Sequence, residues 1–482
     1  MSKKEVLPLI TILSISALLG SSMLTYGHVW WDDFAAYIMQ AESILSGDMP
    51  GFVAHNTITI KNSSSQLGPI TYPWGYPLLL APVYWILGLS PMGFKSVGVF
   101  FYLALLIAFY ILMRRRFTRI ESLFALSLFA FNPMLLDFLD YILTDIPFLF
   151  VSTLAILLID KYATETDQKL LSPFLIGTVI FAGFFLRTPG ILLLGTLLAY
   201  QAWRVLFDRS IFKRLALDSL VTVITFGLFW GLTSVIFPGG QDSYFSHFEE
   251  YGFGLESVLR NAGGYFLVLG EFFKGLPLQE VIFWSFAGFF IIGLLSRLKA
   301  DMLFVLVILP VYLANVVWPE WQGIRFMFPA LPFFVYFALQ GMKVLASRVG
   351  DKKEIFVYII LALLVIGLFS VSTLSGLDNL RNGRQINGPF DPYSMELYDF
   401  IKEETPSESV IVFFRPRVMR LMTGRDSISI TGCDQLMRGD YIALSKKVGD
   451  NLQIPPEEIE DCGLPLEDVY ENRRFVILQI RK

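Results

Sequence analysis

Long apolar runs, separated by polar or charged connections, constrain this chain more than any other feature of its sequence. Of its 482 residues, 54% are hydrophobic and 17% are charged, whereas soluble domains carry about 25% charged residues. A helix needs about 20 mostly apolar residues to cross a bilayer. Such windows predict a polytopic α-helical membrane protein with about eleven spans: 6–26, 91–113, 118–137, 146–160, 172–186, 189–203, 215–237, 279–296, 301–317, 325–345 and 355–375.

Positive charge is concentrated in alternate connections between these spans. The basic segments are residues 114–119, 161–169, 204–214, 297–299 and 343–353, together with Lys3 and Lys4. Cytoplasmic connections carry an excess of Lys and Arg, so this face and the N-terminus are expected in the cytoplasm. The chain is then a multi-pass protein of the plasma (inner) membrane, in contact with membrane lipids.

The opposite, external face has two long loops, 27–77 and 238–278. Loops of this length on a helical scaffold are more often functional than idle. In the first loop, residues 33–46 are predicted to form an amphipathic helix along the interface, with Asp33, Tyr37 and Gln40 on one side. A second interfacial helix is expected after Pro77.

The composition changes after residue 376, which predicts a transmembrane domain over 1–376 and a soluble domain over 377–482. DPYSMELYDFIKEE indicates a helix, and SVIVFF and RFVILQI indicate buried strands. An odd number of spans places this small α/β domain outside the cytoplasm. Cys433 and Cys462 would there meet an oxidising compartment, but their spacing does not decide between a disulfide and two free thiols.

Four polar sites lie where predicted spans reach the external face: Asp32 with Asp33, Asp145, Arg187, and Glu320 with Arg325. Ionisable groups at membrane depth are functional candidates. Each site also has a structural explanation. The acids can cap helices, Arg187 can snorkel to the interface, and Glu320 can pair with Arg325.

The order of these features resembles the polytopic C-type glycosyltransferases, which share the GT-C fold. Within them, it is most similar to the protein O-mannosyltransferases and the lipid A aminoarabinose transferases. The resemblance rests on WWDDFAAYIMQAESILSGD, YPWGYPLLLAPVYWILG, YILTDIPFLF, FLRTPGILL and IRFMFPALPFF, within residues 28–345. The first family motif is often Asp-Glu, whereas this chain has Asp32-Asp33. The identity of the catalytic acid therefore stays open between the two.

The resemblance implies an inverting transfer of a sugar from a polyprenyl phosphate to a hydroxyl of a protein, lipid or glycan at the external face. Asp32 is then the expected general base, with Asp33 orienting it or the acceptor. Asp145 is expected to stabilise the oxocarbenium-like transition state. Arg187 or Arg325 is expected to neutralise the leaving phosphate.

Further residues are expected to bind substrate: Glu320, Trp74, Tyr76 and Tyr37. Trp74 and Tyr76 alternatively belong to an interfacial aromatic belt. No cofactor is required, and a divalent metal is possible but not indicated, because an arginine can take the role of the cation and His28, His55 and Asp32 lack a dependable ligand spacing. Nucleic acid is not an expected partner, since no basic, aromatic-interleaved module is present.

Two other functions compete with sugar transfer. A secondary transporter also carries intramembrane charges, but transporters of common folds show internal repeats and charges near the midplane. This sequence shows no such repeats, and its charges lie at the external ends of spans. The third hypothesis is a scaffold whose external domain binds partners. The sequence identifies neither the sugar nor the acceptor.

Overall fold

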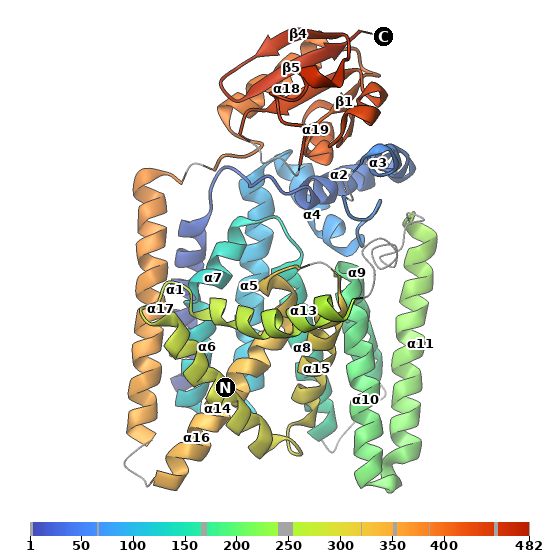
Figure 1. Cartoon of the computed structure of the whole chain (residues 1–482). Helices are drawn as coiled ribbons and strands as arrows, with labels where there is room; N and C mark the ends of the chain where they lie inside the picture. Colours follow the sequence, from blue (N-terminus) through green and yellow to red (C-terminus); the bar gives the residue numbers. More distant parts are fainter. Residues whose placement is uncertain are drawn as a thin grey trace.

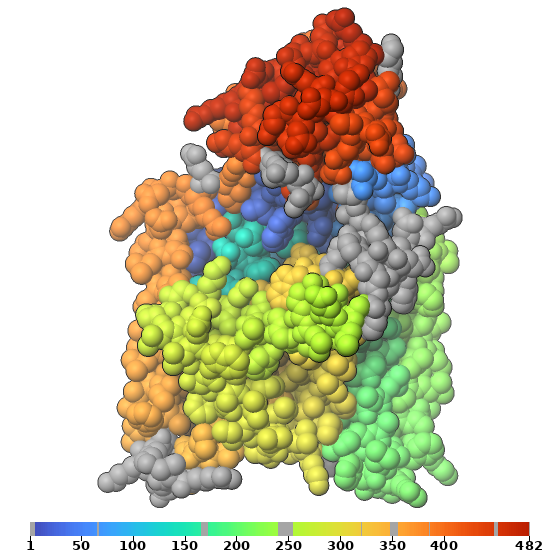
Figure 2. Space-filling view, in the orientation of Figure 1, coloured from blue at the N-terminus to red at the C-terminus, as the bar shows by residue number. Residues whose placement is uncertain are grey.

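The computed structural model describes residues 3–64, 67–164, 171–239, 254–319, 321–349, 354–384, 386–447 and 452–481. A long helical body carries a layer of short helices at one end, and a small sheet domain lies on that layer (Figures 1 and 2). The helices of the body are α1 (Lys3–Met23), α5 (Pro91–Arg114), α6 (Arg119–Ala130), α7 (Pro133–Asp137), α8 (Asp145–Thr164), α9 (Leu171–Leu186), α10 (Ile191–Phe207), α11 (Phe212–Ile236), α13 (Leu255–Leu267), α14 (Gln279–Arg297), α15 (Met302–Val317), α16 (Leu331–Val349) and α17 (Glu354–Asn382).

Within the described residues, eight helices are long and apolar enough to cross a membrane. The expected spans at 172–186 and 301–317 are present as the shorter apolar helices α9 and α15. The expected span at 118–137 is bent by 46° between α6 and α7. Pro133 has no N–H to continue α6, and the side chain of Asn132 accepts a hydrogen bond from Leu135 N instead. The count of eleven spans therefore stays a prediction.

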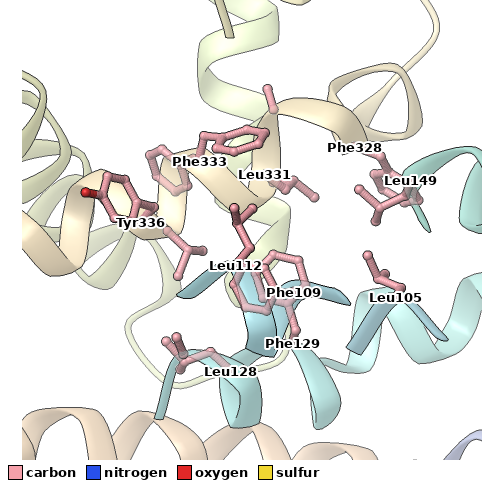
Figure 3. Close-up of a cluster of buried hydrophobic side chains, with 14 of the residues drawn as sticks. Leu105, Phe109, Leu112, Leu128, Phe129, Leu149, Phe328, Leu331, Phe333 and Tyr336 are labelled. Atoms are coloured by element: carbon pink, nitrogen blue, oxygen red, sulfur yellow. The ribbon is translucent and has the colours of Figure 1, made fainter. Parts of the chain in front are cut away.

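The helices of the body meet in a continuous apolar core. Figure 3 shows the part in which α5, α6, α8 and α16 converge; its labelled side chains are Leu105, Phe109, Leu112, Leu128, Phe129, Leu149, Phe328, Leu331, Phe333 and Tyr336. Close packing holds helices together in a membrane, because lipid tails are as apolar as leucine. This core fixes the start of α8 at Asp145 and the short helix η5 (Ile324–Ala330), which carries Arg325.

Three helices, α2 (Asp33–Ser46), α3 (Met49–Asn62) and α4 (Gly75–Leu87), lie across one end of the body (Figure 1). The predicted helix over 33–46 is confirmed. However, it does not lie along an open interface with a solvated polar side, because the sheet domain covers it. Gln40 is fully buried, and its amide exchanges two hydrogen bonds with the main chain of Tyr72.

The C-terminal domain is a small α/β unit, as expected. Its sheet has the order β2-β1-β3-β5-β4, with β1 parallel to β2 and β3, and β5 antiparallel to its two neighbours. Its elements are α18 (Pro392–Glu404), β1 (Val410–Val412), α19 (Pro416–Thr423), β2 (Asp426–Ile428), β3 (Tyr441–Ser445), β4 (Leu466–Glu471) and β5 (Phe475–Ile480). The helix and the two strands predicted from sequence are α18, β1 and β5.

The structure adds two details that the sequence did not predict, one in this domain and one in the helix that precedes it. Cys433 and Cys462 form a disulfide, which decides between the two alternatives that their spacing left open. The boundary expected after residue 376 falls inside α17, which continues to Asn382. The side chain of Asn379 holds this end of α17 against the main chain of Ser22 and Leu24.

Candidate functional site

A cavity of about 940 Å³ opens between the helical body and the layer that carries α2. Six of the nine site residues expected from the sequence line it: Asp32, Asp33, Tyr37, Asp145, Arg187 and Arg325. They come from four separate regions of the chain, so the fold brings together acids and arginines that are distant in sequence.

Asp32 is turned towards the C-terminal domain. Its Oδ1 accepts a hydrogen bond from the main-chain N–H of Arg417 at 3.2 Å, and its Oδ2 lies 3.7 Å from Arg417 Nε. It precedes α2, but its side chain makes no capping hydrogen bond to that helix. Its side chain is 5% exposed, and this burial raises the pKa of Asp32 to about 6, although the Arg417 charge opposes the shift.

Asp33 is the more open of the two acids. It is the first residue of α2, and 28% of its side chain is exposed. Its Oδ1 accepts a hydrogen bond from the Tyr72 hydroxyl at 2.8 Å, and its Oδ2 lies 3.9 Å from an Arg325 nitrogen. A small molecule in the cavity can therefore reach the Asp33 carboxylate more easily than that of Asp32.

Arg187 and Asp145 form a largely buried ion pair. The Arg187 guanidinium donates to Asp145 Oδ1 at 2.5 Å and lies 4.4 Å from the centre of the Phe326 ring. Arg187 precedes η2 (Thr188–Gly190), at the break between α9 and α10. Only 15% of its side chain is exposed, and its guanidinium faces a carboxylate within the cavity lining.

Arg325 lies in η5, and its guanidinium is 5.3 Å from the centre of the same Phe326 ring. Its guanidinium donates to Gln322 Oε1 at 3.0 Å and lies 5.7 Å from the Trp31 ring centre. The 3.9 Å separation from Asp33 is too long for a hydrogen bond. Glu320, its expected partner, lies outside the described residues.

Trp74 and Tyr76 do not line the cavity. The Trp74 indole donates to Pro238 O at 3.0 Å and stacks on Phe237. Tyr76 is 1% exposed and packs edge-on against Tyr37. Tyr37 reaches the cavity wall but is only 5% exposed. These aromatic side chains pack between helices because neighbouring helices cover the segments that carry them.

Part of the cavity lining is apolar. Helices α9, α10 and α15 contribute Leu186, Ile191, Leu192, Leu193, Val307 and Val311 to it. The lining also includes ionisable side chains, among them Asp33, Arg187, Arg325 and Glu271. A ligand with a charged head and a hydrocarbon tail matches this mixed lining.

Several lining residues were not expected from the sequence. The cavity is also lined by Tyr72, Trp318, Trp321 and Arg415. Arg417 lies directly behind the part of the lining formed by Asp32 and Asp33, which we call the acidic wall. The two tryptophans are close to Glu320 and Arg325 in the sequence WPEWQGIRF. They could have been predicted as site residues, because they are aromatic residues next to a charged pair. Arg415 and Arg417 carry no local signal, because their role depends on contacts with the first loop. Among the described residues, no three His, Cys, Asp or Glu side chains are grouped as metal ligands.

The whole fold is similar to those of solved membrane proteins. ArnT from Cupriavidus metallidurans, bound to undecaprenyl phosphate, matches with a TM-score of 0.63 and 14% identity over 99% of this chain and 98% of that chain. The Archaeoglobus fulgidus oligosaccharyltransferase, tethered to an acceptor peptide, matches with a TM-score of 0.63 and 12% identity over 91% of this chain and 69% of that chain. Its complex with an inhibitory peptide and a dolichol-phosphate gives a TM-score of 0.62.

The chain has the GT-C fold. The fold expected from the sequence motifs is thus confirmed. No family model matches the sequence, and no curated protein matches it. At identities of 12–14%, these similarities establish the GT-C architecture.

Proposed function

We propose that this GT-C protein is a membrane glycosyltransferase that moves a sugar from a polyprenyl-phosphate donor to an acceptor hydroxyl. The observation that carries the proposal is the single cavity lined by an exposed carboxylate, two arginines and a set of apolar side chains. Solved proteins of the same fold were bound to undecaprenyl phosphate or a dolichol-phosphate. Both are lipids with a phosphate head and a prenyl tail, which suits a lining with both charged and apolar side chains.

The donor is expected to place its prenyl chain along the apolar side chains of α10 and α15, with its phosphate beside the arginines. Arg325 is the better candidate for binding this phosphate, because it forms no close ion pair in the described structure. Paired N–H donors of a guanidinium stabilise the charge that grows on a leaving phosphate. Arg187, already paired with Asp145, is a second donor beside the same Phe326 ring.

We assign the general base to Asp33 in preference to Asp32. The sequence favoured Asp32, but its carboxylate faces Arg417, while Asp33 is exposed to the cavity. As the acceptor oxygen attacks the anomeric carbon, its proton passes to the Asp33 carboxylate. The bond from that carbon to the donor phosphate breaks on the opposite face, which inverts the configuration. Polyprenyl phosphate leaves, and Asp145 stabilises the positive charge on the sugar ring.

Reconstituted protein tests this assignment. Proteoliposomes would receive polyprenyl phosphates carrying labelled mannose, glucose or aminoarabinose, together with a membrane extract that supplies acceptors. We expect label transfer by the wild type and a loss of about 100-fold or more in Asp33→Asn. Asp399→Asn, an exposed site in α18, is the control and should retain transfer. Full activity in Asp33→Asn would refute the base assignment, and no transfer by the wild type would favour the transporter hypothesis.

A further inference from the structure

The C-terminal domain meets the cavity at Arg415, which lines it, and at Arg417, which lies behind Asp32 and Asp33. Arg417, in the first turn of α19, is fully buried. A guanidinium is rarely buried unless its donors are satisfied. The hydrogen-bond partners of Arg417 therefore show which parts of the structure this side chain holds in place.

Each part of the Arg417 guanidinium contacts the first external loop. One terminal nitrogen donates to Leu67 O at 2.8 Å, and the other donates to Pro69 O at 2.5 Å. Nε donates to Asn56 Oδ1 at 3.2 Å. Leu67 and Pro69 line the cavity, so Arg417 fixes the main chain of that wall.

Arg417 also reaches both acids, by different routes. Its main-chain N–H donates to Asp32 Oδ1, and its Nε lies at an ion-pair distance of 3.7 Å from Asp32 Oδ2. It reaches Asp33 through Tyr72, whose hydroxyl lies 3.4 Å from an Arg417 nitrogen and donates to Asp33 Oδ1 at 2.8 Å. The Arg417 guanidinium lies 5.4 Å from the centre of the Tyr72 ring.

We propose that Arg417 is a positioning residue for the acidic pair and acts on Asp33 through Tyr72, so that the C-terminal domain completes the active site. This inference rests on the proposed sugar transfer. Arg417 does not line the cavity, so it orients the base and does not touch substrate. A planar guanidinium presents donors in several fixed directions, which a lysine ammonium on a flexible stem does not reproduce.

Two mild substitutions test the chain of contacts. Arg417→Lys keeps the charge but loses the fixed donor geometry, and Tyr72→Phe removes only the hydroxyl. Because small displacements of reacting groups slow a reaction strongly, we expect kcat to fall about 10-fold or more in each. The KM for the donor lipid should change little, since the apolar lining is untouched. The double variant should be no slower than the slower single variant, because both changes break the same chain.

Arg425→Lys is the matched control. Arg425 is an arginine of the same domain, but its guanidinium donates to Lys402 O and Thr405 O. None of these three residues lines the cavity. We expect its kcat to stay near that of the wild type. Rates are expressed per mole of protein that binds undecaprenyl phosphate, so a simple loss of folded protein does not mimic a fall in kcat. Hydrogen exchange of amides 67–72 should be faster in Arg417→Lys than in Arg425→Lys.

The outcomes separate the two proposals. Wild-type protein that transfers no sugar would refute the proposed function. An active wild type with unchanged kcat in Arg417→Lys and Tyr72→Phe would refute the positioning role alone. If the fall in kcat of the double variant equals the product of the falls in the two single variants, Arg417 and Tyr72 act independently. That result would refute the shared route through Tyr72.

Discussion

Asp32 and Asp33 are neighbours in the chain, yet their carboxylates have different surroundings. Asp33 begins α2 and faces the cavity, whereas Asp32 lies outside the helix and faces the C-terminal domain. Sequence reasoning identified the pair because two acids beside a membrane are unusual, but it could not assign their roles. The assignment depends on Arg417 and Tyr72, which lie 385 and 39 residues away from the acids that they contact.

The burial of Asp32 predicts a pH-dependent stability. Its pKa rises from 3.8 to about 6 on folding, so the folded protein binds more protons between these values and loses stability as the pH rises through them. At neutral pH the penalty is about 3 kcal/mol, from 1.36 kcal/mol per pKa unit. Asp32→Asn should therefore raise the melting temperature in detergent at about pH 8, and the gain should shrink towards about pH 4.

The exposed Asp399→Asn variant is the control for this measurement, and its melting temperature should follow the wild type at each pH. An Asp32→Asn protein that is destabilised equally at both ends of the pH range would contradict the prediction. Such a result would mean that the contact with Arg417 outweighs the burial of the charge.

Local sequence predicted the other polar residues of the cavity better than its aromatic ones. Asp145, Arg187 and Arg325 were found because a charge interrupts or borders an apolar run, and the structure places all three on the cavity wall. Trp74 and Tyr76 were expected at its mouth but are packed between helices. An aromatic ring has the same local pattern in a binding site as in a core, so only the tertiary fold separates the two.

At the scale of elements, the apolar runs predicted where helices form but not how closely they pack. Gly293 of α14 and Gly341 of α16 bring two main chains together. A methyl group at Gly293 would lie 1.8 Å from Phe337 O, and one at Gly341 would lie 1.9 Å from Phe289 O. Small residues allow such close approach between membrane helices.

This contact predicts opposite results for two glycines of the same helix. Gly293→Ala should lower the melting temperature, because overpacking destabilises by about 1–3 kcal/mol or more. Gly288→Ala should be neutral or slightly stabilising, since a methyl group there meets no atom within 4 Å and alanine favours helix over glycine by about 1 kcal/mol. Melting curves of the two detergent-solubilised variants provide the test, and an equal effect of both substitutions would contradict the packing.

At the scale of the molecule, the connection between α10 and α11 lies at the end of the body opposite the sheet domain (Figure 1). The distribution of Lys and Arg predicts that this connection is cytoplasmic, which places the cavity and the C-terminal domain outside. The fold supports a multi-pass membrane protein, and the sidedness is a proposal that labelling can test.

Single cysteines at two exposed serines report the sidedness. Ser210 lies in η3 (Arg209–Ile211) between α10 and α11, and Ser407 lies in the C-terminal domain. Cys433 and Cys462 are bonded to each other and leave no free thiol. We expect Ser407→Cys to react with an impermeant maleimide in intact spheroplasts, and Ser210→Cys to react only after permeabilisation. The reverse pattern would overturn the proposed orientation.

The contact between Asp32 and Arg417 can form only late in biosynthesis, because 385 residues separate the two in the chain. Translation adds about 5–20 residues per second, so the ribosome makes Asp32 roughly 20 to 80 seconds before Arg417. In the proposed orientation, the first loop crosses the bilayer during that interval, without the side chain that fixes its main chain. Nascent chains and prematurely terminated products therefore lack an ordered acidic wall, and transfer is expected only once almost the entire polypeptide has been synthesised.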